Sequence, residues 1–91
     1  MSKAFTYILE CADGTLYVGW TTDLESRLRT HNAGRGGRYT RGRRPVRLAY
    51  FEEHSTPREA QQREAVLRRL PRAMKLKLIA RDACFKQGGG Q

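Results

Sequence analysis

The stretch TYILECADGTLYVGW, residues 6–20, predicts a β-hairpin. Residues 5–11 and 15–20 are rich in β-branched and aromatic side chains, which favour strands. The Asp13-Gly14 pair between them is a turn signal, since both residue types are typical of tight connections. Each strand carries one tyrosine, Tyr7 or Tyr17, so the geometry of the hairpin decides whether the two phenols can act together.

The length of the connecting loop determines which face each strand residue takes, because successive side chains point to opposite faces. A two-residue turn would put Tyr7 and Tyr17 on opposite faces of the sheet. A three-residue loop over residues 12–14, with Gly14 at positive φ, pairs Tyr7 with Gly19 and puts both tyrosines on one face. We predict the three-residue loop, and with it an open slot at Gly19, beside the Tyr7 phenol, that a ligand can enter. Ordinary strand packing is the alternative role of each tyrosine.

Capping and breaker residues predict the elements that follow the hairpin. The first is a helix from Thr22 or Asp23 to near Gly34, followed by a cationic loop over 34–45 and a strand over 46–53. A second helix begins at Ser55 or Thr56, with Pro57 in its first turn. After Pro71, a short helix runs to about Ala80. The order ββαβαα predicts an α+β fold in which helices flank a small, three-stranded, mainly antiparallel sheet. Residues 1–82 are expected to form this single domain, and the glycine-rich tail, residues 83–91, to be disordered.

Composition indicates the class of partner. The 91 residues include 18 lysines and arginines against nine acidic residues, a net charge of +9, and a small domain with this charge attracts polyanions such as nucleic acid. A solubilising surface or a ribosome-associated protein is the alternative interpretation.

Because no segment approaches the roughly 20 apolar residues of a membrane span, and the N-terminus lacks a signal peptide, we expect a cytoplasmic protein without a membrane partner. Cys11 and Cys84 are expected to be reduced thiols, and no obligate protein partner is indicated.

Two predicted helices bring polar residues to their buried sides. In the first helix Leu24, Leu28 and His31 follow the apolar spacing, and Arg27 lies one turn from Leu24 and from His31, so Arg27 and His31 border the buried face. In the later helix Glu64 falls on the inward stripe marked by Ala60, Leu67 and Leu70. Taking an unpaired carboxylate out of water costs several kcal/mol. Glu64 therefore needs a cation, which is either an arginine, in a Glu64–Arg27 bridge, or a metal ion.

The order of these motifs resembles the GIY-YIG nuclease domain, and in particular its small stand-alone bacterial members. The residues that carry the resemblance are Tyr7, the YVG sequence at 17–19, Arg27, His31-Asn32 and Glu64, within a match from about residue 5 to residue 79. Two features depart from the family pattern. Gly-Ile-Tyr is replaced by Phe5-Thr6-Tyr7, and residues 65–91 contain no asparagine, which many members carry after the glutamate helix.

The resemblance implies a metal-dependent endonuclease that hydrolyses phosphodiester bonds in DNA, with a role in DNA repair or processing. Glu64 would hold one divalent ion, Mg²⁺ or alternatively Mn²⁺. Arg27 would bind a non-bridging phosphate oxygen. Tyr7 and Tyr17 would position or deprotonate the attacking water, and His31 would shuttle a proton or serve only in packing. The residues expected to bind substrate are Gly19, Arg38, Tyr39, Arg41, Arg43 and Arg44, with strand-start packing as the alternative for Tyr39.

A second function fits the same residues. The missing asparagine, together with the lack of an attached DNA-binding domain, favours a basic nucleic-acid-binding module that has the fold without useful turnover. RNA is an alternative partner, and a preference for RNA over DNA would favour the ribosome-associated interpretation.

Overall fold

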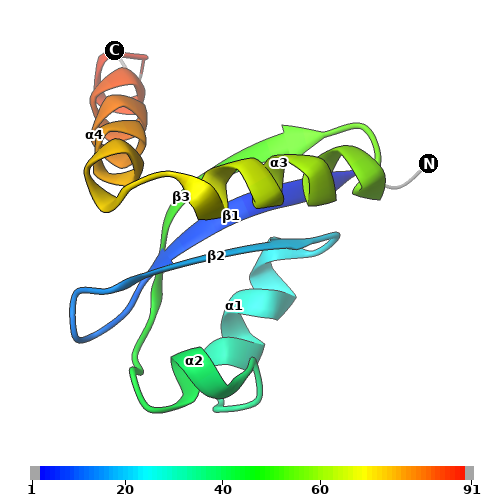
Figure 1. Ribbon diagram of the computed structural model, residues 1–91, viewed down its shortest axis with the longest axis vertical. Helices are drawn as coiled ribbons and strands as arrows, with labels where there is room; N and C mark the ends of the chain where they lie inside the picture. The colour runs from blue at the N-terminus through cyan, green and yellow to red at the C-terminus, as the bar shows by residue number, and fades with distance from the viewer. Residues whose placement is uncertain (1–2, 90–91) are drawn as a thin grey trace.

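The computed structural model describes residues 3–89, with side chains as far as Arg81. Its elements are β1 (Ala4–Glu10), β2 (Leu16–Thr21), α1 (Leu24–Asn32), α2 (Arg38–Arg41), β3 (Arg47–His54), α3 (Pro57–Arg69) and α4 (Arg72–Gly89). The strands form one antiparallel sheet in the order β2-β1-β3, with α1 and α2 on one side and α3 and α4 on the other (Figure 1). The predicted α+β fold is therefore confirmed. Among residues 3–89, no helix combines the length and the apolar character that crossing a membrane requires.

The hairpin has the predicted three-residue loop. The Cys11 amide donates to the Thr15 carbonyl at 2.9 Å, and Gly14 has a φ of +86°. In the resulting register Tyr7 lies opposite Gly19 and Leu9 opposite Tyr17. Both tyrosines are therefore on one face of the sheet, as the loop parity predicted.

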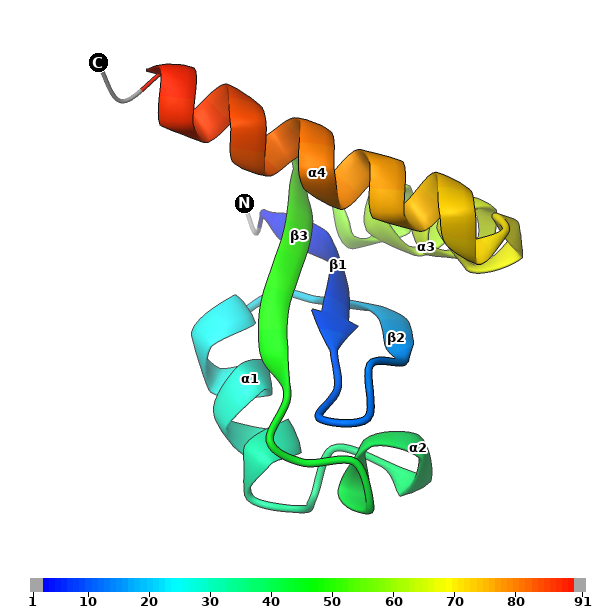
Figure 2. The ribbon, with the colours of Figure 1, turned by 90° about the vertical axis from the view of Figure 1, so that its left-hand side faces the viewer.

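Alternation along the central strand divides the core between the two faces. Tyr7 and Leu9 point toward α1, where they pack with Leu24 and Leu28. Ile8 points to the other face and packs with Leu67 of α3. Figure 2 shows the same division, with α3 and α4 at one end of the view and α1 and α2 at the other. Site residues on α1 and on α3 can therefore meet only at an edge of the sheet.

Local signals define the starts of α1 and α3. Asp23 accepts a hydrogen bond from the Ser26 amide, and Thr56 accepts one from the Glu59 amide, so each is the N-cap of its helix. A buried contact then fixes α3 against the sheet, because the hydroxyl of Thr6, which is fully buried, donates to the Ala60 carbonyl at 2.9 Å. Thr6 stands where the family pattern has isoleucine, and its hydroxyl gives this departure a structural role.

The structure differs from the prediction in two segments. Within the expected cationic loop over 34–45, residues 38–41 form the short helix α2. The last helix continues to Gly89, where an end near Ala80 and disorder from residue 83 were predicted. No proline and only good or moderate helix formers occur between residues 72 and 87, so nothing ends the helix before the glycines that begin at residue 88. Residues 90 and 91 of the predicted tail lie outside the described residues.

Candidate functional site

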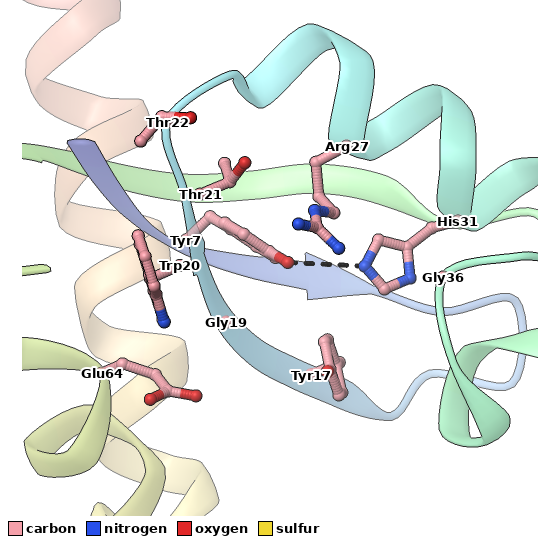
Figure 3. Close-up of a pocket in the computed structure, with 10 residues that line it drawn as sticks. All are labelled: Tyr7, Tyr17, Gly19, Trp20, Thr21, Thr22, Arg27, His31, Gly36 and Glu64. Carbon is pink, nitrogen blue, oxygen red and sulfur yellow. Dashed lines mark hydrogen bonds between the residues drawn. The ribbon is translucent and has the colours of Figure 1, made fainter. Parts of the chain in front are cut away.

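One open pocket of about 350 Å³ brings together most of the residues predicted to be functional. It lies beside β2, at an edge of the sheet, and receives side chains from β1, β2, α1 and α3 (Figure 3). Its lining consists of Tyr7, Tyr17, Gly19, Trp20, Thr21, Thr22, Arg27, His31, Gly36 and Glu64. The position of β2 at the edge explains how Glu64, on the α3 side of the sheet, can share a pocket with Arg27 on the α1 side.

Tyr7 is the most enclosed of the tyrosines in the pocket, with 3% of its surface exposed. A Cβ atom added at Gly19 would lie 2.5 Å from the Tyr7 hydroxyl oxygen and 2.7 Å from Cζ. The prediction of an empty slot at Gly19 is therefore wrong, because the phenol of Tyr7 itself fills that space. Gly19 makes the close approach of the phenol possible and leaves little room there for a ligand.

Hydrogen bonds connect Tyr7 to α2 through His31. The Tyr7 hydroxyl lies 3.4 Å from His31 Nε2, and His31 Nδ1 lies 2.7 Å from the hydroxyl of Thr40 (Figure 3 shows the first of these contacts). His31 and Thr40 are each 1% exposed. The backbone of Gly36 closes the remaining side of the imidazole, since a Cβ there would lie 2.1 Å from Nδ1. His31 is therefore buried in the wall of the pocket, with each ring nitrogen near a hydroxyl group.

Burial shifts the protonation equilibria of this pair toward the neutral forms. Loss of hydration raises the pKa of Tyr7 to about 12, and the nearby Tyr17 phenol contributes in the same direction. Loss of hydration also lowers the pKa of His31 below its ordinary value, with the positive charge of Arg27 as a second cause. At neutral pH the pair is therefore an uncharged phenol beside an uncharged imidazole.

Arg27 and Glu64 approach the pocket from opposite faces of the sheet. Arg27 is exposed, and Figure 3 shows its guanidinium turned toward the space beside the Tyr7 hydroxyl. Glu64 is paired with Arg68 on its own helix, through one guanidinium nitrogen and Oε2. Among the contacts of residues 3–81 there is no ion pair between Glu64 and Arg27, so the structure does not support the Glu64–Arg27 bridge, which was one of the two alternatives for this carboxylate.

The predicted substrate-binding residues of the 34–45 segment lie outside the lining of the pocket. Tyr39 stacks on Tyr17, with ring centroids 5.6 Å apart and planes inclined by 29°. Arg43 contacts the Tyr39 ring and carbonyl as well as Asp13, and Arg44 donates to the carbonyls of Arg41 and Asn32. The remaining members, Arg38 and Arg41, are exposed on α2. Arg43 and Arg44 are therefore engaged in the fold, whereas Arg38 and Arg41 present their side chains to solvent.

Some residues of the site gave only weak signals in the sequence. Gly36 belongs to a glycine-rich segment directly after His31-Asn32, and such glycines are typical of close backbone approach. Thr40 and Arg68 carry no comparable signal, because their contacts depend on how α2 folds back and on a side-chain rotamer in α3. Asn32 has a structural role, since its side chain donates to the Val46 carbonyl and accepts from the Val46 amide, which attaches the start of β3 to α1.

Comparison with known proteins identifies the family. The model of the GIY-YIG catalytic domain matches residues 3–77. The chain belongs to the GIY-YIG family. Relatives include UPF0213 protein CPE1444 of Clostridium perfringens, which is 53% identical over 84% of this chain and 82% of its own length. UPF0213 protein SAG0778 of Streptococcus agalactiae is 50% identical over 84% of this chain and 86% of its own length.

Solved structures of similar proteins have the same fold. The solution structure of UPF0213 protein BH0048 from Bacillus halodurans is 40% identical, with a TM-score of 0.55, and the match covers 86% of this chain and 83% of that one. The solution structure of protein EF2693 from E. faecalis is 37% identical, with a TM-score of 0.61, over 92% and 90% of the two chains. The GIY-YIG domain implies a family of nucleases acting on nucleic acid.

The pocket of this GIY-YIG chain can accommodate a hydrated divalent ion next to one carboxylate. Among residues 3–81, Glu64 Oε2 is bonded to Arg68, and Oε1 makes no hydrogen bond or ion pair. Magnesium keeps several water ligands and is commonly held by one or two carboxylates, so Glu64, which lines the open pocket, fits such an ion. The part of the chain that the structure describes contains no group of three or more His, Cys, Asp and Glu side chains that could form a complete protein cage.

Proposed function

We propose that this chain is a divalent-metal-dependent endonuclease that hydrolyses phosphodiester bonds in DNA. The observation that carries the proposal is the convergence of two phenols, a buried neutral imidazole, a guanidinium and a carboxylate on one open pocket beside an edge strand. The net charge of +9 supports a polyanionic substrate. A role in DNA repair or processing belongs to the same proposal and rests on the resemblance to the family.

Arg27 binds the scissile phosphate in this proposal. Its side chain is exposed, lines the pocket, and carries a planar array of donors that matches phosphate oxygens. Charge on those oxygens grows toward the transition state, so a positioned guanidinium accelerates the reaction more than it tightens substrate binding.

The two tyrosines have different surroundings, which suggests different roles. Tyr17 is partly exposed and can contact the attacking water. Tyr7 is buried, and a pKa of about 12 makes it a poor base on its own. Its hydroxyl bonds to neutral His31, however, so Tyr7 can orient the water and pass a proton toward the imidazole.

Glu64 is the residue that would hold the metal ion, and Arg68, which is bonded to its Oε2, would compete with the ion for the carboxylate. A bound divalent ion would polarise the phosphate and stabilise the leaving oxygen. Gly19 serves the site indirectly, by making room for the Tyr7 phenol.

A nicking assay tests the proposal. The protein is incubated with supercoiled, single-stranded and branched DNA in the presence of Mg²⁺, Mn²⁺ or EDTA. Metal-dependent cleavage by the wild type that is absent from Tyr17→Phe and Glu64→Gln is the expected result. Tyr50→Phe is the matched control, because Tyr50 packs on the opposite face of the sheet and donates to Glu52 outside the pocket. Binding to DNA without cleavage under any of these conditions would favour the non-catalytic module.

A further inference from the structure

Helix α2 supports two residues of the proposed active site at once. Tyr39 stacks on Tyr17 with ring centroids 5.6 Å apart, and Thr40 Oγ1 lies 2.7 Å from His31 Nδ1. The helix has only four residues, and a helix of that length has no independent stability in water. The orientation of Tyr17 and His31 therefore depends on the contacts that fix α2 against the rest of the fold.

The turn of the hairpin provides that support. The Ala12 amide donates to the Arg43 carbonyl at 2.9 Å, and Arg43 Nε donates to Asp13 Oδ2 at 3.0 Å. The other carboxylate oxygen of Asp13 accepts from the amide of Thr15 at 3.1 Å and from its hydroxyl at 2.6 Å. Asp13 thus accepts two hydrogen bonds from Thr15 within the turn and one from Arg43.

Arg43 transmits this constraint to Tyr39. Its Nη1 donates to the Tyr39 carbonyl at 2.7 Å, and its Cζ lies 4.2 Å from the centroid of the Tyr39 ring. The planar guanidinium therefore contacts both the backbone and the ring of Tyr39, and a lysine could not reproduce both contacts.

We propose that Asp13 and Arg43 are positioning residues of the active site, which act through Tyr39 to set the orientation of the Tyr17 phenol. The expected effect on kcat rests on the proposed nuclease function, whereas the effect on the orientation of Tyr17 does not. The role expected for Arg43 thereby changes from phosphate contact to internal support. Because positioning of reacting groups contributes to the rate of the chemical step, loss of the support lowers kcat.

The variant Asp13→Asn distinguishes the two roles of Arg43 by the sign of its effect. Asparagine retains an oxygen for Thr15 but loses the charge that holds Arg43. If Arg43 contacts phosphate directly, removing the acidic neighbour frees its guanidinium, so KM falls and kcat is unchanged. If Arg43 is a positioning residue, kcat falls by about tenfold or more, without an increase in KM.

The matched control is Glu10→Gln. Glu10 forms an exposed ion pair with Arg47 at the same end of the hairpin, and neither residue lines the pocket. The variant removes one negative charge, as Asp13→Asn does, but leaves α2 untouched. We expect it to retain the kcat of the wild type. A double-variant cycle of Asp13→Asn with Arg43→Gln should be non-additive, because both substitutions remove the same support.

NMR of ¹³C-tyrosine-labelled protein provides a readout that does not need cleavage. The ring signals of Tyr17, assigned with Tyr17→Phe, should shift in Asp13→Asn and in Tyr39→Leu, and should stay in place in Glu10→Gln. If the wild type cleaves no DNA, the proposed function fails and these spectra still decide the positioning role. Unchanged Tyr17 signals in Asp13→Asn, or an unchanged kcat with a lower KM, would overturn the inference.

Discussion

The Tyr7 hydroxyl occupies the space that a side chain at residue 19 would fill. A Cβ atom at Gly19 would lie 2.5 Å from the hydroxyl oxygen, well inside van der Waals contact. The same hydroxyl lies 3.4 Å from His31 Nε2. The absence of a side chain at residue 19 therefore lets a strand tyrosine lie across its neighbour and reach a histidine on α1.

Gly19→Ala should consequently disturb both stability and activity. The methyl group must displace a ring that is 3% exposed, and overpacking of this kind costs about 1–3 kcal/mol. We expect a melting temperature at least about 4 °C below that of the wild type, together with loss of nicking. Thermal unfolding monitored by circular dichroism measures the first effect.

Gly42→Ala is the control for this substitution. A Cβ at Gly42 meets nothing within 4 Å, and its φ of −88° suits alanine. It should leave stability unchanged or raise it by about 0.4–1 kcal/mol. Equal melting temperatures for the two alanine variants would contradict the assigned role of Gly19.

The sequence predicted those features of the fold that depend on neighbouring residues or on the alternation of side chains along a strand. Gly14 at positive φ sets the loop length, and the loop length sets the face on which Tyr7 and Tyr17 lie. The N-caps at Asp23 and Thr56 were each one of two candidates. These features need only neighbouring residues, so a single sequence contains enough information to predict them.

Contacts made by side chains across the fold could not be predicted in this way. The helical spacing placed Glu64 on the inward stripe of its helix, and the structure has it lining the pocket, but a helical pattern does not show that its carboxylate pairs with Arg68 and not with Arg27. The segment that contains Tyr39 and Thr40 has the composition of a loop, and it becomes helical where it packs against Tyr17 and His31. Tertiary contacts override local composition there.

The protonation of His31 gives a pH dependence that can be measured. Burial places its pKa in the folded protein below the 6.5 of an exposed histidine. The unfolded state therefore binds more protons than the folded state as the pH falls below about 6.5, and stability falls with it. We expect the melting temperature of the wild type to drop between pH 7 and pH 5 more steeply than that of His31→Gln. Parallel curves of melting temperature against pH for the two proteins would show that protonation of buried His31 does not contribute to the pH dependence of stability.

The exposed arginines of α2 should contribute to DNA affinity without sequence preference. Arg38 and Arg41 present their side chains to solvent, so they are available to phosphate oxygens. Each lost phosphate contact should reduce the slope of log K against log salt concentration by about 0.9 for duplex DNA. Replacing both by glutamine should weaken binding to unrelated sequences equally, as measured by fluorescence anisotropy over a series of salt concentrations.

Arg58→Gln is the charge-matched control for the single variants Arg38→Gln and Arg41→Gln, because each of the three removes one positive charge. Arg58 is exposed in the first turn of α3 and does not line the pocket. Its loss should leave the salt slope unchanged. A similar loss of affinity in every arginine variant would indicate a diffuse effect of net charge instead of a binding surface on α2.

Glu64→Gln separates a metal ligand from a structural ion-pair partner. Glu64 is paired only with Arg68, one helical turn away, among the residues whose side chains are described, and pairs of this type contribute about 0.3–0.5 kcal/mol. The melting temperature without metal should therefore fall by only a few degrees. If Glu64 holds the ion, Mg²⁺ should raise the melting temperature of the wild type but not that of Glu64→Gln, because a ligand that binds only the folded state stabilises it.

Arg68→Gln completes the test, because Arg68 and a metal ion compete for the same carboxylate. Its removal leaves Glu64 intact and frees Oε2, although the hydrogen bond from Arg68 to the Val18 carbonyl is also lost. Some loss of stability without metal is therefore expected, but the stabilisation by Mg²⁺ should appear at a lower concentration than in the wild type. Melting curves of the three proteins over a Mg²⁺ series, run beside the nicking assay, measure both effects. A large destabilisation of Glu64→Gln, with no response of the wild type to Mg²⁺, would refute the assignment of Glu64 as the metal ligand.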